Sequence, residues 1–144
     1  NSYCDAVVHH GDRVIPLEIK TVGDMAFSYR KTTGKPAAYN LMQILIYMYI
    51  LDADMGILLY EHRDTFEKVM IPVRMTEEYL EYIEYMLNWM RDTYAAYDSG
   101  EKPKYFKNRR SNSKICQTCP VKETCDADGN DGIIDLPLLR SIDK

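Results

Sequence analysis

The sequence lacks a membrane-spanning run and an excess of positive charge. Its longest apolar stretch, residues 41–51, is interrupted by Gln43 and is too short to cross a bilayer. We recognise no secretory signal, and we expect a cytoplasmic protein. Lys and Arg number 18 against 22 Asp and Glu, which argues against a large non-specific nucleic-acid surface but allows a local basic groove.

Cysteine is also scarce, because the chain has only four. Cys116, Cys119 and Cys125 follow a CxxC-x5-C pattern, whereas Cys4 lies far away in the sequence. Without a secretory signal, a disulfide framework is less expected than metal or cluster ligation. Three thiolates at this spacing can surround zinc or an iron–sulfur cluster, and either centre needs a fourth ligand. Three unrelated buried cysteines are the alternative.

The chain begins with a predicted hairpin, whose strands cover residues 3–10 and 14–21. Glu18 and Lys20 are two residues apart on the second strand, so their side chains point to the same side. Charged side chains on an otherwise apolar strand are uncommon without a partner. If Asp5 lies beside them at the end of the first strand, the three charges can hold a divalent metal and orient a water.

Two segments with basic or polar features follow. Residues 22–36 are predicted as a loop or broken helix with three cations, and they form either a clamp on a phosphate backbone or a solvated loop. The cations are Arg30, Lys31 and Lys35. Pro36 then opens a buried helix to about residue 52.

That helix carries one polar stripe, formed by Asn40, Gln43 and Tyr47. We expect the stripe to face Asp5, Glu18 and Lys20; alternatively, its amides satisfy buried backbone groups.

The second half of the chain predicts more sheet, a long helix and a basic linker. Strands at residues 56–61 and 66–73 would complete a sheet of at least four strands. A helix capped by Thr76 and ended by residues 99–100 would pack an apolar stripe on the sheet. The stripe is Tyr79, Ile83, Met86, Met90, Tyr94 and Tyr97. The basic linker, residues 102–110, is either a DNA contact or a solvated segment. We therefore expect a core at residues 1–100, with the linker, cysteine cluster and tail at 101–144 packed on it.

The order and spacing of three motifs resemble one known superfamily. Asp5, the triplet Glu18-Ile19-Lys20, and Gln43 with Tyr47 are similar to the PD-(D/E)XK nucleases, and among them to the RecB-like exonucleases. Cys116, Cys119 and Cys125 resemble the C-terminal triplet of the iron–sulfur branch, which includes CRISPR-associated RecB-like exonucleases and AddB helicase-nucleases. The resemblance covers about residues 3–125.

The chain departs from this branch in two ways. Members usually carry a His or Glu on a helix upstream of the Asp, and this chain has no room for it. Their first cluster cysteine normally lies further upstream. The candidate here is Cys4, which on a regular strand points away from the Asp5 side; a cysteine upstream of this sequence is the alternative fourth ligand.

The resemblance implies a fold, a chemistry and partners. The fold is α/β with a restriction-endonuclease-like core, in which helices flank a mixed sheet. Mg²⁺ or Mn²⁺ would be held by Asp5, Glu18 and the Ile19 carbonyl, with Lys20 positioning or activating a water. Gln43 and Tyr47 would orient Lys20 or the DNA backbone. A 4Fe-4S cluster, or alternatively Zn²⁺, would be bound by Cys116, Cys119, Cys125 and Cys4.

The implied function is a metal-dependent exonuclease that acts on single-stranded DNA or DNA ends. A helicase, recombination or CRISPR-type protein would be its partner. The alternative is a catalytically silent, cluster-bearing subunit for DNA binding or assembly.

Overall fold

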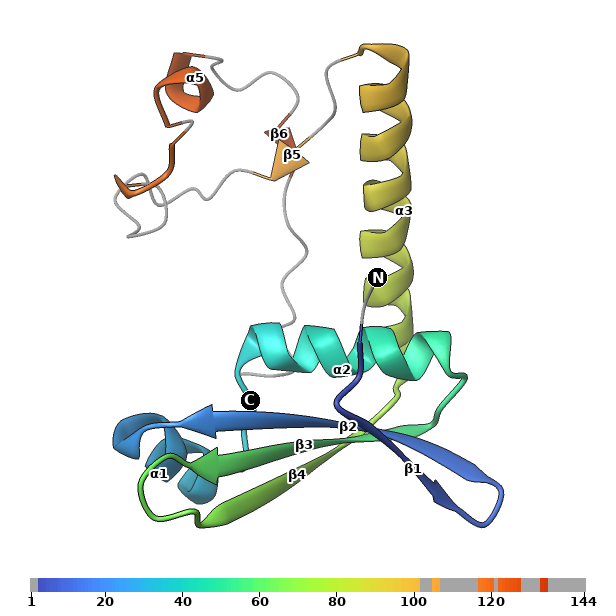
Figure 1. The fold of residues 1–144 in the computed structure, drawn as a ribbon. Helices are drawn as coiled ribbons and strands as arrows, with labels where there is room; N and C mark the ends of the chain where they lie inside the picture. Colours follow the sequence, from blue (N-terminus) through green and yellow to red (C-terminus); the bar gives the residue numbers. More distant parts are fainter. Residues whose placement is uncertain (1–2, 102–104, 107–116, 121, 128–132, 135–144) are drawn as a thin grey trace. The chain divides into compact units, whose positions relative to one another are not determined.

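The structure, a computed structural model, describes residues 3–101, 105–106, 117–120, 122–127 and 133–134. The chain divides into two compact units, and the boundary lies within α3 (Glu77–Ser99), between Tyr85 and Met86. The first unit contains a four-stranded sheet and two further helices (Figure 1). Its elements are β1 (Ala6–His10), β2 (Arg13–Val22), α1 (Asp24–Thr33), α2 (Ala38–Ile50), β3 (Met55–His62) and β4 (Lys68–Arg74). This mixed sheet flanked by helices confirms the predicted α/β class and is consistent with a restriction-endonuclease-like core.

The sheet has the strand order β1-β2-β3-β4, and its central pair is parallel. The outer pairs, β1 with β2 and β3 with β4, are antiparallel. The β1–β2 turn contains Gly11 with φ +60°, as a two-residue hairpin with glycine at its first central position requires. Parallel strands need a long connection, and α1 and α2 supply it between β2 and β3.

The segment predicted as a loop or broken helix contains an unbroken helix, α1. Gly23 is its extended N-cap, and Asp24 lies in the first turn, where its negative charge suits the helix dipole. Gly34 ends the helix in a left-handed conformation with φ +65°, and its N–H donates to the Arg30 carbonyl. The glycines at both ends and Pro36 beyond them are the sequence signals for these boundaries.

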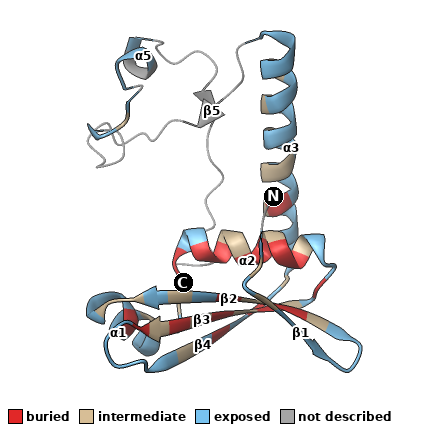
Figure 2. Cartoon of the chain, viewed as in Figure 1, coloured by how far each residue is buried: buried red, intermediate tan, exposed pale blue. Residues whose placement is uncertain are grey.

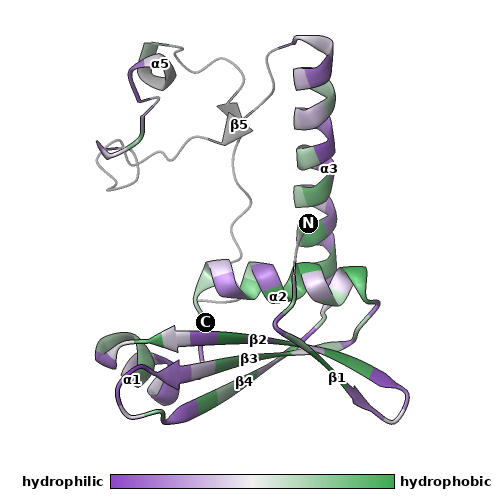
Figure 3. Cartoon of the chain, viewed as in Figure 1, coloured by the Kyte–Doolittle hydropathy of each residue, from purple (hydrophilic) through white to green (hydrophobic). Residues whose placement is uncertain are grey.

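Helix α2 lies across one face of the sheet and forms the core with β3 (Figures 1 and 2). It begins at Ala38 rather than at Pro36, and it is largely apolar (Figure 3). Gly56 on β3 permits its close approach, because a Cβ there would lie 2.7 Å from Ile44 Cγ1 and 2.9 Å from Met48 Sδ. Ile44 and Met48 are both fully buried, so α2 and β3 are in direct contact at this point.

Two expectations about the later elements are corrected. Phe66, predicted to begin a strand, instead has φ +58° in the turn before β4. The stripe on α3 was expected to pack on the sheet along its length, but only Ile83 is buried on α3. Met90, Tyr94 and Tyr97 are exposed. Partial burial on α3 also raises the pKa of the Tyr82 phenol by desolvation.

The second unit contains short elements beyond α3. The strands β5 (Tyr105–Phe106) and β6 (Ile133–Ile134) pair in parallel, and α5 covers Lys122–Ala127. The rest of the basic linker, residues 102–104 and 107–110, lies outside the described residues. Within the part that the structure describes, no helix is long and apolar enough to cross a membrane.

Candidate active site

The edge of β2 is open where β1 stops pairing with it, and Asp5 occupies this edge. The β1–β2 ladder ends at the pair Ala6 and Leu17. Asp5 Oδ2 then accepts a hydrogen bond of 2.8 Å from the backbone N–H of Ile19, in place of a strand partner. The N–H and C=O of one strand residue project to the same edge, so the Ile19 carbonyl lies on the Asp5 side of β2. A carboxylate accepts several bonds, and Asp5 can therefore bind a cation as well.

Glu18, Lys20 and Gln43 form a closed group of polar contacts between β2 and α2. Lys20 Nζ lies 2.6 Å from Glu18 Oε1 and 2.9 Å from Gln43 Oε1. Gln43 Nε2 in turn donates to Glu18 Oε1 over 2.8 Å. Each contact has a donor and an acceptor, which sets the orientation of the Gln43 amide. The predicted meeting of the strand pair with the polar stripe is thus observed at Gln43.

The second oxygen of Glu18 has no such partner. Glu18 is 3% exposed, and its Oε2 is buried without a hydrogen bond among the described residues. An unsatisfied buried acceptor costs about 1–3 kcal/mol, and more when it is charged. A hard divalent cation would satisfy this oxygen, because Mg²⁺ binds carboxylate and carbonyl oxygens. Glu18, Asp5 and the Ile19 carbonyl offer hard oxygen donors, the type of ligand that Mg²⁺ and Mn²⁺ prefer.

Tyr47 connects this group to the segment that carries Asp5. Its hydroxyl accepts from Gln43 Nε2 over 3.2 Å and donates to the Tyr3 carbonyl over 2.5 Å. Tyr3 precedes Asp5 by two residues, so the phenol ties the segment that carries Asp5 to α2. Tyr47 is itself 6% exposed, and its packing holds the hydroxyl in place.

Asn40, the third member of the predicted stripe, lies elsewhere than expected. Its Nδ2 donates to the Tyr60 hydroxyl over 2.9 Å, and the Ala37 N–H donates to the same oxygen over 3.2 Å. Tyr60 belongs to β3, so this bond attaches the Asn40 amide to β3 and not to the charged side chains of β2. The prediction that Asn40 directly faces the three charges is wrong, because the start of α2 lies over β3 rather than β2.

A second group with potential metal ligands surrounds His62, a residue that no sequence motif had indicated. The ligand atoms of Asp24, His62 and Asp64 lie within 4.8 Å of one another. However, His62 Nδ1 accepts from the N–H groups of Asp64 and Thr65, at 3.1 and 3.2 Å. The proton must then be on Nε2, which donates to Asp24 Oδ1 over 2.6 Å. Both ring nitrogens are occupied, so this group does not fit a metal.

His62 could have been found from the strand pattern. Gly56, Leu58, Tyr60 and His62 alternate along β3, and all four are buried. The edge of the buried Phe27 ring packs on the imidazole, with the centroids 5.2 Å apart.

The cysteines predicted to bind a cluster fall in different units. The Cys4 thiol lies 3.0 Å from the Ala6 carbonyl and 3.4 Å from the Leu17 carbonyl, within the hairpin. Cys119, in the second unit, is half-buried with a free thiol. Cys125 belongs to α5, and Cys116 lies outside the described residues. The iron–sulfur or zinc centre therefore stays a prediction.

Comparisons with known proteins do not assign a family. No protein-family model matches the chain. No match was found among curated proteins either. A solved structure described as "Crystal structure of SSO0001" is similar over 86% of this chain and 50% of the other, with 22% identity and a TM-score of 0.46. The chain thus spans about half the length of that protein, and a similarity at this level carries no argument about function.

Proposed function

We propose that this protein is a metal-dependent DNA nuclease of the PD-(D/E)XK kind that hydrolyses phosphodiester bonds in single-stranded DNA or at DNA ends. The observation that carries the proposal is the buried, unsatisfied Oε2 of Glu18. The other oxygen of this carboxylate contacts Lys20, and the next residue, Ile19, donates its N–H to Asp5. A protein that only needed stability would gain by replacing such a carboxylate with an apolar side chain. Its presence therefore favours a role in binding a cation.

Each side chain has a separate task in this proposal. Asp5, Glu18 and the Ile19 carbonyl would hold Mg²⁺ or Mn²⁺, which when bound polarises the scissile phosphate and lowers the pKa of a water. Lys20 uses two of its three N–H donors on Glu18 and Gln43 among the described residues. The third can be donated to a water or to a phosphate oxygen, where it offsets negative charge that develops during hydrolysis.

Gln43 and Tyr47 position these groups. Gln43 keeps Lys20 beside Glu18 through its two amide contacts. Tyr47 holds the chain just before Asp5. These contacts are made before DNA binds, so the site would need little reorganisation during the reaction.

The direct test is digestion of end-labelled linear DNA by the purified full chain. We expect degradation of single-stranded or end-containing DNA with Mn²⁺ or Mg²⁺, and none with a chelator. Lys20→Ala should lower the rate by about 10²–10⁴-fold, because it removes the donor nearest the reacting groups. Circular dichroism and thermal melting would show that the variant still folds.

Lys68→Ala is the matched control. Lys68 is a half-exposed lysine on β4, the edge strand that is not adjacent to β2, and it forms an ion pair with Glu61. It should leave the digestion rate unchanged. If DNA stays intact with both metals while a control nuclease digests it, the proposal is wrong. DNA binding without digestion would favour the catalytically silent subunit.

A further inference from the structure

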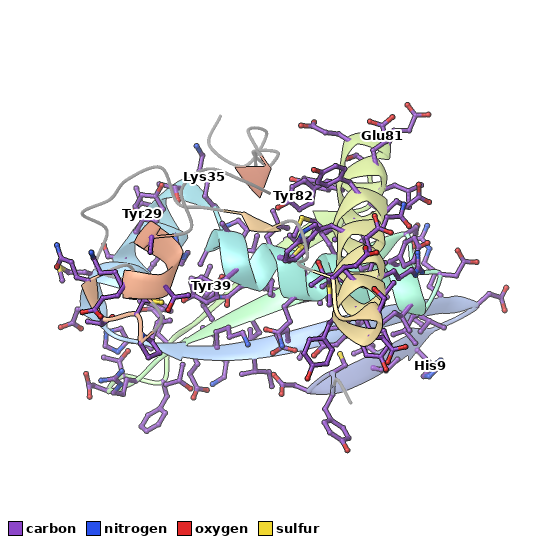
Figure 4. The ribbon with its side chains drawn as sticks, turned by 90° about the horizontal axis from the view of Figure 1, so that it is seen from above. His9, Tyr29, Lys35, Tyr39, Glu81 and Tyr82 are labelled. Carbon is purple, nitrogen blue, oxygen red and sulfur yellow. The ribbon has the colours of Figure 1, made fainter. Side chains whose placement is uncertain are left out.

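The end of α1, the start of α2 and the segment between them carry exposed aromatic rings and basic side chains. Tyr29 is 50% exposed and Tyr39 is 75% exposed. Lys35, also exposed, lies between them in the sequence. Figure 4 shows the three side chains around the same end of α2. We call Tyr29, Arg30, Lys35 and Tyr39 the aromatic–basic track.

Contacts of Arg30 hold the track together. Its guanidinium lies 5.0 Å from the centre of the Tyr29 ring, and its Nη1 donates to the Lys35 carbonyl over 3.2 Å. The same guanidinium lies 5.7 Å from the ring of Tyr60, which also binds the first residues of α2. The ends of both helices are therefore fixed around one cation, and Tyr39 extends from the first turn of α2.

The track leads to the candidate active site. Tyr39 and Gln43 are four residues apart on α2, so they share one face of the helix. Gln43 contacts both Glu18 and Lys20. A strand lying over Tyr39 would thus be one helical turn, about 5.4 Å, from the residue that touches the catalytic group.

The charge of the track is opposite to that of the chain. The chain has a net charge of −4, yet residues 25–51 contain three cations and no Asp or Glu. Lys31 is paired with Glu67 and adds little to the local field. Arg30 and Lys35 remain on the track, and they complement a phosphate backbone.

We propose that the aromatic–basic track binds single-stranded DNA and directs it to Lys20, an inference that rests on the proposed nuclease function. The bases stack on Tyr39 and Tyr29, and Lys35 neutralises a phosphate. Only an unpaired strand offers free base faces to exposed rings, because the bases of a duplex are stacked on one another. The track therefore selects single-stranded over double-stranded DNA.

The test separates base stacking from charge and from cleavage. Binding of a fluorescent oligo-dT strand is measured by anisotropy in the presence of a chelator, against an abasic strand of the same length and a duplex. We expect the wild-type protein and the Lys20→Ala variant to bind oligo-dT more tightly than the abasic strand or the duplex. Tyr39→Ala should weaken binding of oligo-dT by about 5–100-fold and leave the abasic strand unaffected, as loss of a stacked base does.

Three further variants sharpen the result. Tyr39→Phe should retain the affinity for oligo-dT, because it keeps the ring. Tyr94→Ala removes a tyrosine that is 71% exposed on α3, and it should have no effect. Lys35→Ala should weaken binding to both single strands and reduce the salt dependence by about 0.7 in the logarithmic slope.

Equal wild-type affinity for the oligo-dT and abasic strands would overturn this proposal, as would a Tyr39→Ala variant that folds and binds oligo-dT within twofold of wild type. In either case, metal-dependent digestion would leave the nuclease function standing. Base-dependent binding without digestion would support the aromatic–basic track as a DNA-binding surface and would contradict the nuclease function.

Discussion

The Glu18 group and the His62 group are both polar clusters built around one buried ionisable side chain, yet their hydrogen bonds are completed differently. At His62, both ring nitrogens have partners, two of which are N–H groups of the turn between β3 and β4. At Glu18, one oxygen accepts two bonds and the other has none among the described residues. The first group has the properties of a structural connection, whereas the second leaves a buried carboxylate oxygen for the cation that we propose.

The comparison shows that proximity of acidic and histidine side chains is a weak sign of a metal site. Asp24, His62 and Asp64 meet a distance criterion, but the imidazole has no lone pair left for a metal. The carboxylate of Glu18 is more informative, because burial makes its missing partner costly.

Replacing Glu18 with Gln should have the largest effect on function. The variant keeps the size of the side chain but removes the charge that would bind the cation, so we expect at least a hundredfold loss of nuclease activity. Mn²⁺ affinity, measured by calorimetry, should fall in parallel, while the melting temperature stays the same or rises. Asp24→Asn is the matched variant in the His62 group, and it should leave Mn²⁺ affinity unchanged. Equal loss of Mn²⁺ binding in both variants would remove the distinction between the two groups.

Replacing His62 with Phe should mainly affect stability. Phe keeps an aromatic ring next to Phe27 but leaves two backbone N–H groups and Asp24 without their partner. We expect the free energy of unfolding, measured with urea, to fall by about 1–3 kcal/mol. At a temperature where the variant is folded, its Mn²⁺ affinity should equal that of the wild type. A selective loss of Mn²⁺ binding would instead identify His62 as a ligand.

Replacing Tyr47 with Phe should have a smaller effect, on metal affinity. The variant loses the hydrogen bond to the Tyr3 carbonyl and so loosens the segment that carries Asp5. Removing a group that orients a metal ligand typically weakens binding by about 10–100-fold, and we expect the lower end here. The Mn²⁺ concentration for half-maximal activity should rise, with the rate at saturating Mn²⁺ nearly restored. A lower rate that excess Mn²⁺ does not restore would assign Tyr47 to Lys20 or DNA instead.

Much of the fold followed from local patterns. The hairpin at residues 3–21 and the strands near residues 56–61 and 66–73 were predicted, and the structure contains the four strands that they indicated. The helix α1 was not predicted as a continuous helix, although Gly23 and Gly34 cap it. Phe66 was predicted to begin a strand, but the turn before β4 places it in a left-handed conformation.

The candidate site was also predictable in part from the regular repeat of strands and helices. Glu18 and Lys20 share a face because a strand has a period of two, and Gln43 and Tyr47 share a face because they are one helical turn apart. Nothing local could show that Asn40 binds Tyr60 rather than the charged group, or that His62 would have both nitrogens occupied.

Local sequence patterns establish which side chains lie together on each strand and helix, because backbone geometry repeats at fixed intervals. Which of these faces meet depends on the packing of the helices on the sheet. The close approach of α2 over Gly56 brings Gln43 to Glu18 and Lys20, and the early end of the β1–β2 ladder leaves the Ile19 N–H for Asp5. Such contacts join residues far apart in the chain, and they depend on how closely the helix and the sheet pack.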